Sequence, residues 1–203
     1  MFVSISDDYK EKPVFEKKIL GKYLLKNEDF EKTEILLLWR KLGDKQYFSK
    51  FKKLKAVIRY GTGYDNVDVR YLKTNNIKLF NNPDYCIEEV SDTVIALVLS
   101  RMRRLKQYDE ISNNIMSSPK KYFFKNTIDD IERISDKNFG VLGAGSIGQM
   151  VLKKSSVFFK NTGFHDPYLK KSRYLSKYKN FKNLKDFLKW SDVISINANL
   201  NLS

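Results

Sequence analysis

Short apolar runs alternate with longer amphipathic stretches along most of the chain. The runs are rich in Val, Ile, Leu and Phe without strict polar alternation, which is typical of parallel strands buried on both faces. We expect strands at residues 2–6, 34–39, 55–60, 77–81, 139–142, 163–165 and 193–197. We expect helices between them at about residues 15–26, 46–53, 67–75, 146–159 and 184–190. This alternation predicts an α/β fold with open parallel sheets.

One amphipathic stretch is longer than the others. From Ile87 to about Tyr108, apolar residues recur at steps of three and four, with acidic side chains early and basic ones late. A helix of this length extends about 30 Å, enough to cross from one domain to another. We therefore expect a first domain at residues 1–86, a domain-crossing helix at 87–112 and a second domain at 113–203.

The charge of the chain is strongly positive, but lysine carries most of it. The 203 residues have a formal net charge of +14, and lysine supplies 30 of the 38 basic residues. Sequence-specific readers of nucleic acids rely on the arginine fork instead. We interpret the charge as a solvated lysine-rich surface and do not expect a nucleic-acid partner. The alternative, a nucleic-acid binder, predicts steeply salt-dependent retention on a polyanion.

Other compositional features limit the class of protein. No run reaches the ~20 apolar residues that a membrane span requires. The first residues lack the basic and apolar regions of a signal peptide. The single cysteine, Cys86, cannot form an internal disulfide or a zinc site, which fits a reducing compartment. We expect a cytoplasmic protein with no membrane partner and no metal site.

A glycine-rich segment in the second half carries the most specific motif. Residues 139–148 contain G-x-G-x-x-G at Gly143, Gly145 and Gly148, between an expected strand and an expected helix. Such glycines permit a tight turn, close approach of a pyrophosphate and close helix packing. Asp166 follows Gly148 by 18 residues, near the ~20 typical of an acid that binds the ribose of NAD. Basic residues within 170–173 keep NADP open as the alternative.

The first half carries a second glycine loop. Residues 59–68 read RYGTGYDNVD and follow an expected strand. A two-glycine turn exposes backbone amides that can bind an anion, at the strand end where α/β sheets hold ligands. A plain strand-to-helix turn capped by Asp65 or Asn66 explains the same residues equally well. The residues alone leave both interpretations open.

Together these segments resemble the D-isomer-specific 2-hydroxyacid dehydrogenases, most closely the branch of phosphoglycerate dehydrogenase-like and C-terminal-binding-protein-like members. The resemblance is carried by residues 54–68, 82–93, 140–148, 165–168 and 191–196. It implies a flavodoxin-like substrate domain followed by a Rossmann NAD-binding domain, with the active site between them. It also implies NAD as the cofactor, a small 2-hydroxy or 2-keto acid as the substrate and a homodimer through the cofactor domain.

The resemblance also assigns roles to residues. Four residues would hold the substrate carboxylate, largely through backbone amides: Tyr60, Gly61, Thr62 and Gly63. Those implied at the cofactor, from nicotinamide to pyrophosphate and ribose, are Val94, Gly143, Gly145, Ser146, Ile147, Gly148, Asp166, Ala198 and Asn199. The family usually has a His and a Pro near the last two positions, where this chain has Asn197 and Asn199.

The catalytic groups implied by the family are not among these residues. An Arg that fixes the substrate, a His that acts as acid and base, and a Glu that raises the pKa of this His would all lie beyond Ser203. The one histidine, His165, lies beside Asp166 on the adenosine side. From residue 139 we expect three strands, the first half only of a Rossmann domain.

We therefore expect a truncated dehydrogenase that is catalytically inactive by itself, since loss of an acid–base group costs ~10²–10⁴-fold in rate. The alternative is a non-catalytic NAD-binding scaffold or corepressor-like protein.

Overall fold

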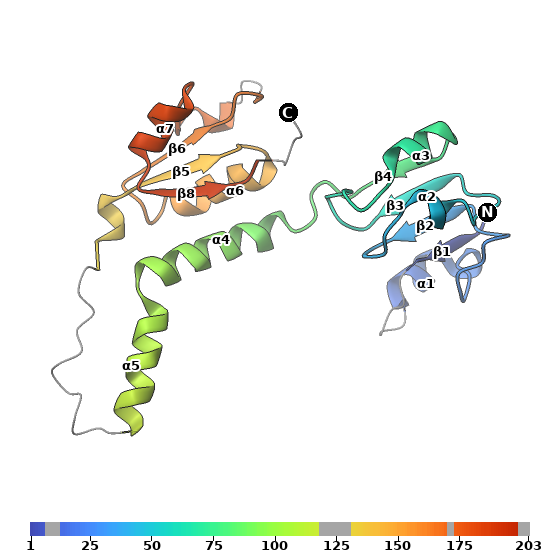
Figure 1. Ribbon diagram of the computed structural model, residues 1–203, viewed down its shortest axis with the longest axis horizontal. Helices are drawn as coiled ribbons and strands as arrows, with labels where there is room; N and C mark the ends of the chain where they lie inside the picture. Colours follow the sequence, from blue (N-terminus) through green and yellow to red (C-terminus); the bar gives the residue numbers. More distant parts are fainter. Residues whose placement is uncertain (7–12, 118–130, 170–172, 199–203) are drawn as a thin grey trace. The chain divides into compact units, whose positions relative to one another are not determined.

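The chain folds into two compact units, residues 1–86 and residues 87–203, each built on its own parallel sheet. The structure is a computed structural model that describes residues 1–6, 13–117, 131–169 and 173–198 (Figure 1). All seven expected strands are present within about two residues of their expected bounds. The predicted parallel α/β fold is confirmed.

The first unit has a four-stranded sheet in the order β1-β2-β3-β4. Its elements are β1 (Val3–Ile5), α1 (Val14–Leu20), a 3-10 turn (Gly21–Tyr23), β2 (Ile35–Leu38), α2 (Lys45–Phe48), β3 (Ala56–Arg59), α3 (Val69–Thr74) and β4 (Lys78–Phe80). A parallel bridge joins Leu24 to the free side of Val3. If this bridge counts as a remnant strand, the order becomes the 2-1-3-4-5 order of flavodoxin-like sheets.

The core of the first unit lies between the sheet and the short helices α2 and α3. Phe48 and Leu72 from these helices are buried together with Leu36, Leu38 and Val57 from the strands. Aspartates begin both helices, because Asp44 accepts from the amide of Tyr47 and Asp68 from that of Tyr71. The helices predicted at residues 15–26 and 46–53 are shorter than expected, because α1 covers Val14–Leu20 and α2 covers Lys45–Phe48.

The second unit starts with two helices and continues into a second sheet. Its elements are α4 (Ile87–Met102), α5 (Leu105–Ser117), a 3-10 turn (Ile134–Asp136), β5 (Asn138–Leu142), α6 (Ser146–Ser155), β6 (Asn161–His165), a 3-10 turn (Arg173–Leu175), β7 (Lys179–Asn180), α7 (Leu184–Trp190) and β8 (Val193–Ile196). In Figure 1, α7 lies on one side of this sheet and α6 on the other.

The strand order of the second sheet is β7-β6-β5-β8, all parallel. In chain order this is 3-2-1-4, the beginning of the Rossmann order 3-2-1-4-5-6. The expected count of three strands was wrong, because β7 is only two residues long and carries no apolar run. β8 therefore lies beyond the first half, and the order reverses between β5 and β8. Open sheets bind ligands at such a reversal.

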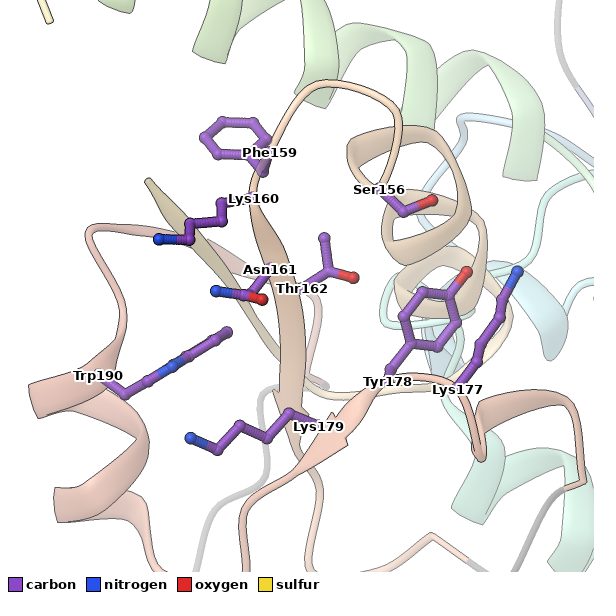
Figure 2. A pocket seen from close by; sticks show the side chains of 9 residues that line it. All are labelled: Ser156, Phe159, Lys160, Asn161, Thr162, Lys177, Tyr178, Lys179 and Trp190. Carbon is purple, nitrogen blue, oxygen red and sulfur yellow. The ribbon is translucent and has the colours of Figure 1, made fainter. Parts of the chain in front are cut away.

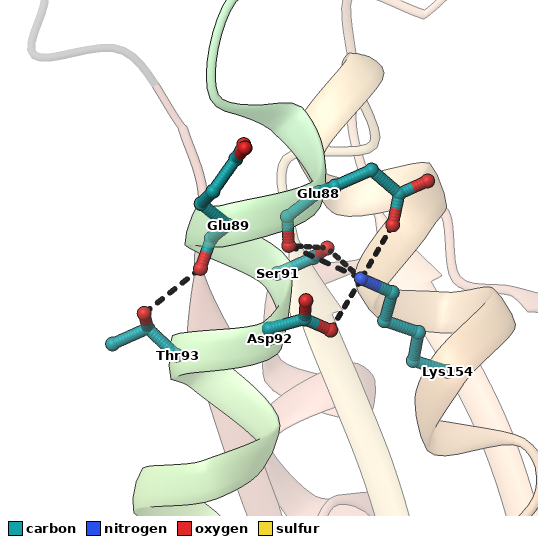
Figure 3. A network of polar contacts seen from close by, with 6 residues as sticks. All are labelled: Glu88, Glu89, Ser91, Asp92, Thr93 and Lys154. Carbon is teal, nitrogen blue, oxygen red and sulfur yellow. Dashed lines mark hydrogen bonds and ion pairs between the residues drawn. The ribbon is translucent and has the colours of Figure 1, made fainter.

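Within the second unit, helix α4 packs against α6 and the core of the sheet. Its Val94, Val98 and Met102 contact the buried core that includes Phe139 and Val151. A polar network adds to this packing (Figure 3). Lys154 of α6 donates to Asp92 at 2.6 Å and to the Ser91 hydroxyl at 2.8 Å, and pairs with Glu88 at 2.7 Å.

The single helix expected over residues 87–112 is wrong. Helix α4 ends at Met102, and Arg104 adopts a φ of 56°, in the left-handed region that breaks an α-helix. Helix α5 then begins at Leu105. The apolar period continues from Met102 to Leu105 across the break, and no glycine or proline marks it, so the pattern predicted one helix.

Candidate functional site

The glycine loop between β5 and α6 has the backbone shape that its motif predicts. Gly143 has a φ of +88°, and a Cβ there would lie 2.7 Å from the amide nitrogen of Ala198. A Cβ on Gly148 would collide with the carbonyl oxygen of Gly143. A Cβ on Gly145 would meet no atom within 4 Å. Two of the glycines are thus required by the fold, whereas Gly145 borders open space.

Helix α6 presents its amino end at this open space. Gly145 is the N-cap residue and supplies no side chain, so no side-chain cap covers the first amides. Gly145 and Ser146 are exposed, while Ile147 is half-buried and packs on the core. The first amides of an α-helix lack intrahelical acceptors and carry the positive end of its dipole. This end of α6 can therefore hold an anionic group such as a pyrophosphate.

The carboxylate of Asp166 lies beside the same loop. Asp166 follows β6, which pairs with β5 in a register that places His165 opposite Leu142. Its Oδ2 accepts from the amide of Ala144 at 2.8 Å, and its Oδ1 accepts from the amide of Tyr168 at 3.0 Å. The half-buried carboxylate keeps lone pairs for further hydroxyl donors, and its charge opposes a phosphate there.

His165 is a core residue. Its side chain is 9% exposed, and Nδ1 lies 2.8 Å from the carbonyl oxygen of Phe181. The ring also lies near that of Phe187, with centroids 6.2 Å apart. The imidazole therefore stabilises the sheet.

The remaining residues implied at the cofactor differ in position. The backbone of Ala198 lies against Gly143, beside the glycine loop. Val94 is half-buried and packs on the core of the second unit. Asn199 lies outside the described residues.

In the first unit, the side chains of the predicted carboxylate loop are used to hold the loop itself. The Tyr60 hydroxyl donates to Glu16 at 2.7 Å. The Thr62 hydroxyl lies 3.0 Å from the carbonyl oxygens of both Asn82 and Tyr85. In the described part of the chain, the amides of residues 61–63 donate no backbone hydrogen bond. These amides are the groups that the loop offers to an anion.

Arg59 is a candidate residue that the sequence analysis missed. It ends β3, and its Nε donates to Oδ1 of Asn66 at 3.3 Å. Its Nη1 is buried without a hydrogen-bond partner among the described residues, and a Cβ on Gly61 would lie 3.3 Å from it. An unpaired guanidinium nitrogen thus lies beneath the loop. The sequence signal for it was an arginine at the carboxyl end of a strand, in a chain whose basic residues are mostly lysine.

The alternative of a plain capped turn fails in one detail. The residue that caps α3 is Asp68, and neither Asp65 nor Asn66 does so. Asn66 instead links Arg59 to the carbonyl oxygen of Lys41, to which its Nδ2 donates at 2.9 Å. Asn66 and Arg59 therefore stabilise the loop, and the amides of residues 61–63 have no backbone acceptor among the described residues.

Comparison with protein families identifies the chain. The family model described as the catalytic domain of D-isomer specific 2-hydroxyacid dehydrogenases matches residues 8–196. The chain belongs to this family.

In the part of the chain that the structure describes, no cluster of three His, Cys, Asp or Glu side chains could hold a metal ion, and no helix is long and apolar enough to cross a membrane.

Relatives of the family agree with this assignment. A Staphylococcus epidermidis protein provisionally named a 2-hydroxyacid dehydrogenase is 30% identical over 161 residues, which cover 79% of this chain and 49% of that protein. A similarly named Staphylococcus saprophyticus protein is 27% identical over 186 residues, or 91% of this chain and 57% of that protein. The chain thus spans about half the length of these curated relatives.

Solved structures share the fold. D-lactate dehydrogenase of Aquifex aeolicus, crystallised with NAD and lactic acid, has a TM-score of 0.82 at 22% identity, over 98% of this chain and 60% of that one. An acyclic imino acid reductase in complex with NADPH and D-Arg has a TM-score of 0.79 at 23% identity, over 100% of this chain and 66% of that one. These structures have the predicted fold, and the chain spans 60–66% of their length.

Proposed function

We propose that this chain provides the NAD-binding unit and the carboxylate-binding loop of an oxidoreductase that interconverts a small D-2-hydroxy acid and its 2-keto acid. The observation that carries the proposal is the open space at Gly145, with the amino end of α6 and the Asp166 carboxylate beside it. Bound NAD would supply or accept the hydride. The residues at the cofactor are those of the glycine loop with Ile147, Asp166 and Ala198, and Val94 is proposed at the nicotinamide.

The choice of NAD rests on Asp166. A carboxylate accepts hydrogen bonds from ribose hydroxyls and repels the 2′-phosphate of NADP. The two hydrogen bonds from backbone amides hold the Asp166 carboxylate in place beside the glycine loop. We propose NAD as the preferred cofactor on this ground.

Substrate binding rests on the loop of residues 60–63. The backbone amides of residues 61–63 and the unpaired Nη1 of Arg59 can together hold a carboxylate, since charge-assisted bonds from a guanidinium are among the strongest. Tyr60 and Thr62 would act by shaping the loop, because their hydroxyls already donate within the first unit.

The resemblance implies a histidine as the acid and base of the reaction. The sole histidine, His165, is buried against a backbone carbonyl. We propose that a polypeptide of these residues binds NAD without turning over a 2-keto acid. The scaffold function stays open on the same observation, and measurable dehydrogenase activity in a longer protein would exclude it.

A binding titration with a charge-neutral variant tests the proposal. Wild type and Asp166→Asn are titrated with NADH and NADPH, with nucleotide fluorescence as the readout. Asparagine keeps one oxygen for the Ala144 amide and replaces the acceptor of the Tyr168 amide with an NH2 group, so the variant removes the charge together with that one hydrogen bond. We expect wild type to prefer NADH by at least ~10-fold, equivalent to about 1.4 kcal/mol, and the variant to lose most of this preference. Equal binding of both nucleotides by wild type would refute the NAD assignment.

We also propose that the protein works in the cytoplasm, where the free Cys86 would stay reduced.

We further propose that the protein forms a homodimer through the second unit. Support for the dimer comes from helix α5, which buries no residue and exposes Leu105, Tyr108 and Met116 on one face. Sedimentation of wild type and Leu105→Glu tests it, and a monomeric wild type would argue against it.

A further inference from the structure

A cavity of about 440 Å³ lies in the second unit, away from the glycine loop (Figure 2). It is formed where β6 begins, at Asn161 and Thr162, whereas Asp166 follows the other end of this strand. β7 pairs with β6 only from Gly163 onward, so the first two residues of β6 have no partner on this side.

The charges around this cavity are all positive. Of the residues that the structure describes, Lys160, Lys177 and Lys179 line it, and no Asp or Glu does so. None of the three lysines forms an ion pair with a described residue, in contrast to Lys154, which has two carboxylate partners. The ammonium of Lys177 lies 5.0 Å from the ring centroid of Tyr178, and that of Lys179 lies 5.1 Å from the ring centroid of Trp190. Aromatic faces thus hold two cations at the cavity.

A buried hydroxyl without a partner also borders the cavity. The side chain of Tyr178 is 6% exposed, and its hydroxyl has no hydrogen-bond partner among the described residues. A buried tyrosine hydroxyl ordinarily finds a partner, because leaving it unpaired costs free energy. In Figure 2 this hydroxyl points toward α6, away from Lys179 and Trp190. Tyr178 lines the cavity, and its hydroxyl can donate to a ligand oxygen that reaches it.

These observations together define the ligand's chemistry. Unpaired lysines and a hydroxyl donor suit a phosphate, which lysine binds as a point charge. The volume falls in the range of ~300–1,000 Å³ of small-molecule sites, and so leaves room for an organic group against Trp190. We propose that this cavity binds a small phosphate monoester, at a site separate from the NAD site proposed above.

Calorimetric titration of the full 203-residue chain with phenyl phosphate tests the site. Tyr178→Phe removes only the unpaired hydroxyl, so its melting temperature should not fall, while its affinity should drop at least about fivefold. The double variant Lys177→Gln/Lys179→Gln should lose measurable binding. Lys185→Gln changes an exposed lysine of α7 outside the cavity, removes one of the two charges that the double variant removes, and should bind as wild type does.

Four results would overturn the proposal. The first is no binding of phenyl phosphate to wild type. The second is an equal loss of affinity in Lys185→Gln and in the cavity variants, which would indicate the general surface charge. The third is displacement of phenyl phosphate by saturating NADH, which would place it at the glycine loop. Inorganic phosphate and phenol, titrated in parallel, show whether the phosphate or the ring dominates, and binding of phenol alone would also contradict the proposal.

Discussion

At the scale of single residues, the glycines of the β5–α6 loop have separable roles. Gly148 is required by the fold, because a Cβ there would collide with the Gly143 carbonyl oxygen, whereas a Cβ on Gly145 meets nothing. The same substitution to alanine should therefore act in two different ways. This contrast separates the folding requirement from the ligand requirement.

Gly148→Ala should lower the free energy of unfolding by ~1–3 kcal/mol, as overpacking does. Gly145→Ala should cost under ~1 kcal/mol, because its φ of −67° suits alanine at an exposed N-cap, yet it should weaken NADH binding. Urea unfolding and NADH titration of both variants measure the two effects. An unchanged NADH affinity in Gly145→Ala would show that no pyrophosphate approaches this backbone.

Glu34 makes the stability of the first unit sensitive to acid. The hydrogen bond from Lys55 and that from the N-terminal amine lower the pKa of Glu34 from 4.5 to about 2. A carboxylate whose pKa falls on folding stabilises the fold above its unfolded pKa, and this contribution disappears as the pH falls from about 4.5 to 2. Glu34→Gln should reduce the loss of stability between pH 6 and pH 3. Glu31→Gln, an exposed control, should leave the pH profile of urea unfolding unchanged.

At the scale of elements, the Lys154 network attaches α4 to α6. Its hydrogen bonds, first to Asp92 and then to Glu88, raise the pKa of Lys154 above 10.5. This contribution to stability is fully present below pH 10.5 and is lost as the pH rises through the raised pKa.

Lys154→Gln should lower the melting temperature of the second unit at pH 7 and expose α4 to faster amide hydrogen exchange. Lys153→Gln, an exposed neighbour, should change neither. Unchanged exchange in α4 of the Lys154 variant would mean that the apolar contacts of Val94, Val98 and Met102 suffice.

The sequence predicted the elements whose pattern is local and missed those set by their neighbours. The apolar strands and the turn before α6 follow from nearby residues, so both were predicted. β7 is defined only by pairing with β6, and the break at Arg104 carries no glycine or proline. The unpaired Nη1 of Arg59 depends on tertiary packing beneath Gly61, which no local pattern reveals.

At the scale of the whole chain, we expect the edge of β8 that faces away from β5 to promote self-association. Among the described residues β8 pairs only with β5, and its Ile196 is 73% exposed. Unpaired strand edges with apolar side chains promote edge-to-edge pairing. Ile196→Lys should reduce the aggregated fraction in light scattering, whereas Leu188→Lys on α7 should have little effect. Equal effects of both would indicate general solubility instead of the strand edge.

The central claim is that the glycine loop of the second unit binds the dinucleotide, and amide chemical shifts test it most directly. The ¹⁵N-labelled chain is titrated with NADH in a heteronuclear NMR experiment. We predict saturable shifts at Gly143, Gly145, Ser146, Gly148 and Asp166, with residues 177–179 unchanged. Shifts confined to residues 156–162 and 177–179, or no shifts at millimolar NADH, would contradict the claim.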